Sequence, residues 1–129
     1  MLFLSCSKVL TQSKSQLLSM ARKVDPAVKE IIPENINAGI KCSDYGPGCM
    51  GAFQAQMKRV KIIFVQFKSE EQAKAEALRI DQYYSKHWVF DDVTGEPVLE
   101  NLVKKVYKAQ RPSIYYKKKL KELSDQSQP

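Results

Sequence analysis

The 129-residue sequence lacks any long hydrophobic run and contains little cysteine or histidine. No apolar stretch reaches the ~18 residues that a membrane-spanning helix needs, so we expect no transmembrane segment. The three cysteines, Cys6, Cys42 and Cys49, are too few for a domain held together by disulfides. His87 is the only histidine, so a zinc site built from Cys and His would lack a fourth ligand. With 43% hydrophobic residues the chain can still bury a core, and its length predicts one domain.

Motifs that carry known catalytic chemistry are missing as well. The sequence contains no Gly-x-Ser-x-Gly elbow, no nucleotide-binding loop ending in Gly-Lys-Ser/Thr and no Cys-x-x-Cys. Asp91 and Asp92 precede Thr-Gly and are typical of a solvated turn, and His87 is typical of a capping or surface residue. We therefore expect a non-enzymatic protein without cofactor or metal. An oxidoreductase that uses Cys42 or Cys49 on a thioredoxin-like body is disfavoured.

Residues 42–51 form the most irregular stretch, with three of the five glycines and one proline. A glycine-rich loop before a helix can cradle phosphate, but the third glycine of the dinucleotide fingerprint is absent. Cys42 and Cys49 can form a disulfide, bind a metal or remain thiols. The sequence favours a structural loop with two unpaired thiols, followed by a short helix over residues 52–58.

The chain is organised around a strand over residues 60–67 and the helix that follows it. The strand is a short run of Val, Ile and Phe, which is typical of burial on both faces. Ser69 can cap the helix, with Gln72 completing a capping box. The apolar positions within residues 70–85 recur at helical spacing and predict one buried stripe, formed by Ala73, Ala77, Ile80 and Tyr84.

The remaining elements predict an α/β or α+β fold. Asp25 and Pro26 open a short helix whose apolar side is formed by Val28, Ile31 and Ile32. A second strand is expected over residues 86–90 and another helix over residues 97–109, starting at Pro97. The architecture is then a small sheet around strand 60–67, with helices 70–85 and 97–109 packed on it and helical extensions at both ends.

One segment resembles a known family. Phe64 to Phe67 followed by Ser69 to Ala73 resembles the third strand and second helix of the RNA-recognition motif. The resemblance covers about 25 residues and implies exposed aromatic side chains that stack on RNA bases.

Charge is concentrated at the two ends of the chain. Residues 1–24 carry four basic and no acidic side chains, whereas residues 25–103 are slightly acidic. Residues 1–23 are amphipathic, hydroxyl-rich and free of acid, which predicts a mitochondrial presequence ending near Arg22 and Lys23. The alternative is an amphipathic helix packed on the body. The expected organisation is a presequence-like segment 1–23, a body 24–110 and a basic arm 111–129.

The C-terminal part predicts a docking surface for an anionic partner. Between residues 104 and 121 there are eight cations and no acid, interleaved with tyrosines. The candidate docking residues are Lys104, Lys105, Lys108, Arg111, Tyr115, Tyr116, Lys117, Lys118, Lys119 and Lys121. Such a segment suits other protein subunits, an anionic membrane surface or ribosomal RNA. We expect an accessory subunit of a large mitochondrial assembly, with a respiratory-chain complex favoured. The alternative is a mitochondrial ribosomal or other RNA-binding subunit.

Overall fold

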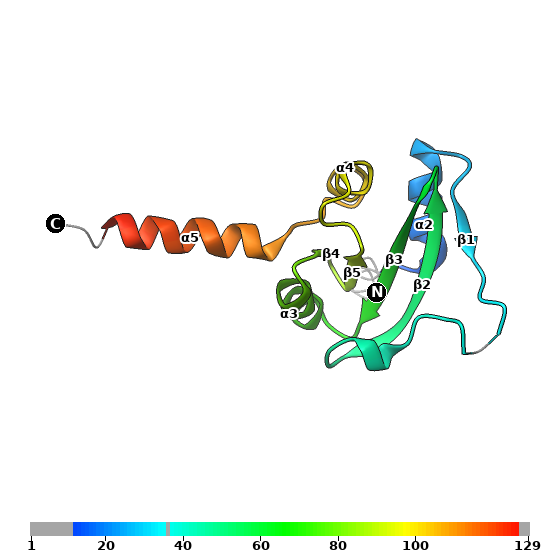
Figure 1. The fold of residues 1–129 in the computed structure, drawn as a ribbon, viewed down its shortest axis with the longest axis horizontal. Coiled ribbons are helices and arrows are strands. Elements are labelled where there is room, and N and C mark those ends of the chain that lie inside the picture. The colour runs from blue at the N-terminus through cyan, green and yellow to red at the C-terminus, as the bar shows by residue number, and fades with distance from the viewer. Residues whose placement is uncertain (1–11, 36, 127–129) are drawn as a thin grey trace, which may run out of the picture.

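The computed structural model describes residues 12–35 and 37–126, and Figure 1 shows their fold. The elements in chain order are α2 (Lys14–Val24), β1 (Lys29–Ile31), the 3-10 turn η1 (Cys42–Asp44), β2 (Cys49–Met57), β3 (Val60–Phe67), α3 (Glu70–Ile80), β4 (Tyr83–Ser85), β5 (Trp88–Asp91), α4 (Pro97–Val106) and α5 (Pro112–Gln126). In this part of the chain the strands form one antiparallel sheet in the order β1-β2-β3-β5-β4. The predicted mixture of sheet and packed helices is confirmed.

Strand β3 lies at the centre of the sheet, as its sequence predicts. Its side chains alternate between two cores: Ile62 and Phe64 point to one, and Ile63, Val65 and Phe67 to the other. Helices α2 and α4 contribute to the first core and α3 to the second. Because both faces are covered, the strand can be apolar at almost every position.

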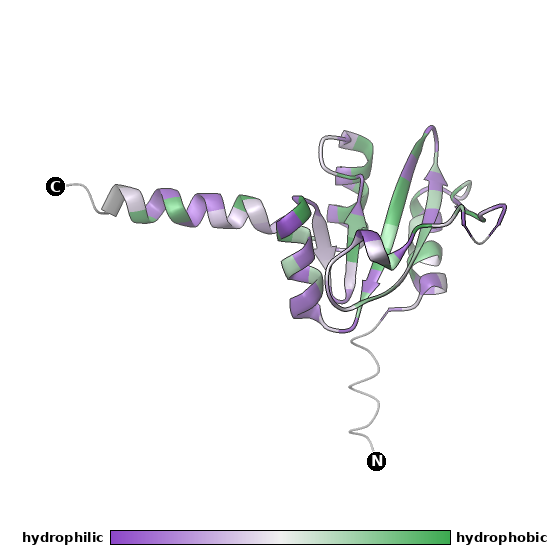
Figure 2. Cartoon of the chain, turned by 60° about the horizontal axis from the view of Figure 1, so that its bottom comes forward, coloured by the Kyte–Doolittle hydropathy of each residue, from purple (hydrophilic) through white to green (hydrophobic). Residues whose placement is uncertain are grey.

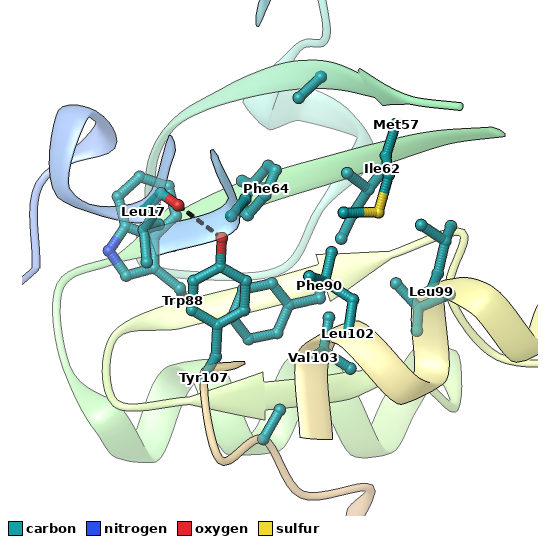
Figure 3. Close-up of a cluster of buried hydrophobic side chains, with 14 of the residues drawn as sticks. Leu17, Met57, Ile62, Phe64, Trp88, Phe90, Leu99, Leu102, Val103 and Tyr107 are labelled. Carbon is teal, nitrogen blue, oxygen red and sulfur yellow. Dashed lines mark hydrogen bonds between the residues drawn. The ribbon is translucent and has the colours of Figure 1, made fainter. Parts of the chain in front are cut away.

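The first core is dominated by aromatic rings in neighbouring strands. Phe53 of β2 lies opposite Phe64 of β3, and their stacked ring centroids are 4.5 Å apart. Phe90 of β5 lies on the other side of Phe64, with the two ring centroids 5.7 Å apart. Tyr107 stacks on Phe90, and its hydroxyl donates a 2.6 Å hydrogen bond to the carbonyl of Leu17 in α2 (Figure 3). This cluster joins the sheet to both helices on that face.

The resemblance to the RNA-recognition motif requires exposed aromatic rings, whereas the rings of this segment are buried. Phe64 and Phe67 are almost completely buried, on opposite faces of the sheet. A ring that stacks on a base must be reachable from solvent. The exposed aromatic platform implied by the resemblance is therefore not formed by these residues.

Helix α3 begins at the predicted Ser69 cap but ends earlier than expected. The predicted capping box is only half formed, because the buried side-chain oxygen of Gln72 has no hydrogen-bond partner among the described residues. The Ser69 hydroxyl accepts a 3.1 Å hydrogen bond from the Gln72 backbone N–H, and Ala73 and Ala77 are buried against the sheet. The helix stops at Ile80 because Asp81 adopts a left-handed conformation, with φ of 58°. The expected helix over 70–85 is thus too long, and Tyr84 belongs to β4 instead of the helical stripe.

The helix predicted over residues 52–58 is wrong, since these residues lie in β2. Ala, Gln and Met have high intrinsic helix propensities, which favoured a helix. The apolar and polar residues nevertheless alternate with the period of two that is typical of a strand. Phe53, Ala55 and Met57 point into the first core, while Gln54 and Gln56 occupy the alternate positions. Pairing with β3 along almost its whole length outweighs the helix propensity.

The short helix predicted after Asp25 and Pro26 is also wrong. Asp25 instead caps the end of α2, and its carboxylate accepts a hydrogen bond from the Ala27 backbone N–H in a tight turn. The chain then enters β1, which pairs with Gln54 to Gln56 of β2 at the edge of the sheet.

Two other boundaries differ slightly from expectation. The second strand starts at Trp88, because Lys86 and His87 form the turn between β4 and β5, with Lys86 at φ of 54°. Helix α4 starts at Pro97 as predicted but ends at Val106 instead of residue 109. No helix in the described residues is long and apolar enough to cross a membrane.

Cys42 and Cys49 are joined by a disulfide, which corrects the expectation of two unpaired thiols. The intervening loop packs on α3: the Gly46 backbone N–H donates a 2.8 Å hydrogen bond to the buried carboxylate of Glu76. A β-carbon on Gly48 would lie 2.2 Å from the side-chain oxygen of Gln72, so the loop approaches the helix closely. These glycines serve packing, and a carboxylate of the protein occupies the Gly46 donor that a phosphate would use.

Helix α2 is part of the core, which corrects the expected boundary of the body at residue 24. Leu17, Leu18 and Ala21 are buried, and the indole N–H of Trp88 donates a 2.7 Å hydrogen bond to the carbonyl of Gln12. The alternative reading, an amphipathic helix packed on the body, therefore applies to residues 14–24. Residues 1–11 of the predicted presequence lie outside the described residues.

Candidate functional site: the C-terminal arm

Helix α5 extends away from the body as a single rod (Figure 1). Its first residue, Pro112, is buried, whereas the described side chains from Ile114 onward are exposed. It lies near α3 only through its first turns, where Arg111 and Ser113 reach the end of that helix. In the described part of the predicted arm, residues 111–126, the first residues (the root) are held against the body and the rest of α5 (the shaft) projects from it.

The root is held by the carboxylate of Asp81, the residue that ends α3. Arg111 binds it with two hydrogen bonds, from Nε to Oδ1 at 2.9 Å and from Nη2 to Oδ2 at 2.7 Å. The Ser113 hydroxyl donates to the same carboxylate. The hydrogen bonds from Arg111 and then Ser113 lower the pKa of Asp81 from 3.8 to about 2. This fork-shaped pairing fixes the orientation of the Arg111 guanidinium as well as its position.

Backbone pairing holds the segment just before the arm. Tyr84 and Gln110 exchange two hydrogen bonds of 2.9 Å between their backbone N–H and carbonyl groups. The Ser85 hydroxyl donates a 2.7 Å hydrogen bond to the carbonyl of Tyr107. The chain between α4 and α5 thus lies along β4 and covers that edge of the sheet.

The structure separates the candidate docking residues into three groups. Lys104, Lys105 and Lys108 lie in or just after α4 and are exposed, with the Lys104 ammonium 5.7 Å from the centre of the Tyr83 ring. Arg111 pairs with Asp81, so its guanidinium is occupied within the chain. The remaining candidates lie exposed on α5: Tyr115, Tyr116, Lys117, Lys118, Lys119 and Lys121.

The α5 helix also exposes apolar side chains between its lysines. In Figure 2 the ribbon of α5 carries both hydrophilic and hydrophobic residues along its length. The exposed fractions are 50% for Ile114, 60% for Tyr115, 42% for Tyr116, 65% for Leu120 and 52% for Leu123. Several large apolar side chains exposed on one short helix are typical of a surface that another molecule covers.

Several other side chains that could carry chemistry form hydrogen bonds within the chain. Asp91 accepts a 2.6 Å hydrogen bond from the Tyr45 hydroxyl, and Asp92 lies exposed in the following turn. Burial and this hydrogen bond raise the pKa of Tyr45 above its usual range. Arg79 lowers the pKa of Glu76 through two hydrogen bonds to its carboxylate, while Gly46 adds a third. Within residues 12–35 and 37–126, no three His, Cys, Asp or Glu side chains form a cluster that could hold a metal ion.

Comparisons with known proteins found no match: no family model matches the chain, and neither a curated protein nor a solved structure is significantly similar to it.

Asp81 and the two leucines of α5 were not among the residues predicted for the site. Asp81 lies 30 positions before Arg111, so sequence spacing gives no sign that the two form an ion pair. Leu120 and Leu123 could have been found, because with Tyr116 they recur at helical spacing within the lysine-rich segment.

We expect Arg111→Gln to return the pKa of Asp81 from about 2 towards its ordinary value of 3.8, because the strongest interaction that lowers it is lost. A lowered pKa means that the pair stabilises the protein above pH 3.8 and that this contribution disappears as the pH falls through about 2. The Asp81 carboxylate is half exposed, so the effect on global stability should be small. NMR titration of the Asp81 carboxyl carbon measures the shift directly.

Lys105→Gln is the matched control, since it removes one positive charge from the exposed surface of α4. It should leave the titration of Asp81 nearly unchanged. If Asp81 already titrates near its ordinary value in the unaltered protein, the root of the arm is not held as described.

Proposed function

We propose that this chain is a non-enzymatic accessory subunit of a large mitochondrial assembly and that α5 docks it to its neighbours. The observation that carries the proposal is the contrast between body and arm. The body buries two cores against its sheet, whereas α5 holds its apolar side chains in solvent. An isolated helix of about 15 residues is marginal in water, so contact with another molecule would stabilise it.

The side chains with shifted pKa values make contacts within the chain, which supports a role outside catalysis. Active sites concentrate groups with shifted pKa values around an open position for substrate. Here Glu76 holds the disulfide loop, Asp81 holds the arm and Tyr107 joins β5 to α2. Hydrogen bonds within the chain lower the pKa values of Glu76 and Asp81, and burial in the first core raises the pKa of Tyr107.

A mitochondrial location is supported by the basic, acid-free N-terminal sequence. Because Leu17 and Leu18 are core residues, import would have to leave α2 in place. The Cys42–Cys49 disulfide favours a compartment that does not keep thiols reduced. We expect the chain in the matrix or associated with the inner membrane. Of these two, the disulfide favours the inner membrane, on the side that faces the intermembrane space. A respiratory-chain complex remains the favoured assembly.

The alternative is a mitochondrial ribosomal or other RNA-binding subunit. It is supported by the exposed lysines of α4 and α5, which suit a phosphate backbone. The burial of Phe64 and Phe67 removes the base-stacking surface that would have strengthened it.

Sedimentation of detergent-solubilised mitochondria tests the proposal. The full chain, detected by antibody, should sediment with a large complex that RNase does not disrupt. A chain ending at Ser113 keeps the pairing of Asp81 with Arg111 but lacks the shaft of α5, so it should remain in the light fractions.

The shortened chain should melt at nearly the same temperature as the full chain. Its sedimentation then reports the loss of docking and not a loss of folding. A full chain that sediments alone would refute the proposal. A complex that collapses on RNase treatment would establish the ribosomal alternative instead.

A further inference from the structure

We propose that the partner of α5 is an α-helical segment of another protein, apolar along one side and acidic along its flanks. This inference rests on the proposed docking role of α5 and names the chemistry of the docking partner. It follows from the arrangement of side chains around the helix.

Tyr116, Leu120 and Leu123 form a narrow apolar seam along α5. They recur at spacings of four and three residues, and at 3.6 residues per turn they fall within about 60° of arc. All three are substantially exposed. In a heptad repeat Tyr116 and Leu123 take d positions and Leu120 an a position, which is the spacing of a helix–helix seam.

The width of the seam argues against a lipid surface. A helix lying in a membrane interface, or packed on a broad core, uses an apolar face of about 100° or more. Tyr115 is separated from the seam by Lys119, and Ile114 lies on the opposite side of the helix, near Lys118 and Lys121. A membrane could not cover both sides, whereas a partner helix needs only the seam.

Lysines on both flanks of the seam specify the charge of the partner. Lys117 takes an e position and Lys119 a g position, the places from which charged side chains reach across to a neighbouring helix. Both are exposed, so their ammonium groups are available to carboxylates of the partner. An antiparallel pair of α5 helices would instead bring lysines together, which disfavours a second copy of this chain.

RNA would satisfy the lysines but leave the seam uncovered. A phosphate backbone offers no apolar surface to Leu120 and Leu123, and it does not distinguish flank lysines from those on the far side. A helical protein partner accounts for both the seam and its flanks.

The test uses purified full-length protein and four defined probes. They are a synthetic heptad peptide with Leu at a and d and Glu at e and g, the same peptide with Lys at e and g, anionic phospholipid vesicles and a single-stranded RNA. The acidic peptide should bind at least about tenfold more tightly than each of the others. A monomeric chain in sedimentation equilibrium is expected, and self-association through α5 would overturn the inference.

Matched variants locate the contact on the helix. L120S/L123S should weaken binding of the acidic peptide by about tenfold or more. Ile114→Ser, which removes an exposed aliphatic side chain on the opposite side of the helix, should weaken it by less than about twofold. Lys119→Glu should weaken binding more than Lys118→Glu, although the two change the net charge equally. The inference would be overturned if the seam variant and its control lost the same affinity for the acidic peptide, or if the two lysine variants did. Tighter binding of vesicles or RNA than of the acidic peptide would also overturn it.

The outcomes separate this inference from the proposed function. Specific binding of the acidic peptide by a chain that sediments alone in mitochondria would refute the subunit role and leave the seam intact. A chain that sediments with the assembly equally well with and without L120S/L123S would refute the seam and leave the subunit role intact.

Discussion

Replacing Phe64 with alanine is expected to lower the free energy of unfolding by about 3–5 kcal/mol, the range found for buried aromatic residues. Phe64 is only 1% exposed and contacts the rings of Phe53, Phe90 and Tyr107. These rings come from different segments, so they cannot all move to fill the space that the substitution leaves. Chemical denaturation with the disulfide intact gives the value.

Tyr115→Ala provides the matched control, because it removes an aromatic ring that is 60% exposed. Its effect should stay within about 0.5 kcal/mol, as is usual for surface substitutions. A loss below about 1 kcal/mol for Phe64→Ala would mean that the first core is not packed as described.

Removal of residues 1–23 is expected to abolish cooperative folding. The deletion takes Leu17, Leu18 and Ala21 from the core. The loss of a single buried leucine side chain costs about 2–5 kcal/mol, and the whole stability of a domain is only about 5–15 kcal/mol. The hydroxyl of Tyr107 would also lose its acceptor, the carbonyl of Leu17. Circular dichroism during heating should show no sharp transition for residues 24–129.

A chain of residues 12–129 is the control for this deletion. It retains α2 and the carbonyl of Gln12 that accepts the hydrogen bond from Trp88, so it should melt cooperatively. If residues 24–129 melt like the full chain, α2 is dispensable and processing after Lys23 becomes compatible with the fold.

The elements predicted best are those whose local signals agree with their tertiary surroundings. Residues 60–67 are β-branched and aromatic, and they are buried on both faces as this composition indicates. The start of α3 follows from Ser69, and the start of α4 from Pro97. In these three places the residues close by in the sequence are sufficient to predict the element or its start.

The failures occur where distant contacts decide the outcome. The residues of β2 favour a helix by themselves, and only pairing with β3 and β1 makes them a strand. Asp81 ends α3 in a left-handed conformation, which no periodicity reveals. The Cys42–Cys49 bond likewise depends on a loop that brings two α-carbons to 5.5 Å.

The choice of the C-terminal segment as a docking site rests on its lysines and tyrosines and stays a prediction. Arg111 was placed among the docking residues because its charge is visible in the sequence, whereas its pairing with Asp81 is visible only in the fold. The role proposed for Leu120 and Leu123 rests on their exposure on a projecting helix.

Because α5 is held at one end only, a small rotation at that end produces a large displacement of the other. At 1.5 Å per residue its 15 residues reach about 22 Å, with Asp81 at the pivot. A rotation of about 10° at this pivot would move the tip by about 4 Å for a helix of that length. Because Arg111 and Ser113 at the base of α5 bind the Asp81 carboxylate, slight rearrangements at the end of α3 would be magnified at the far end of the helix.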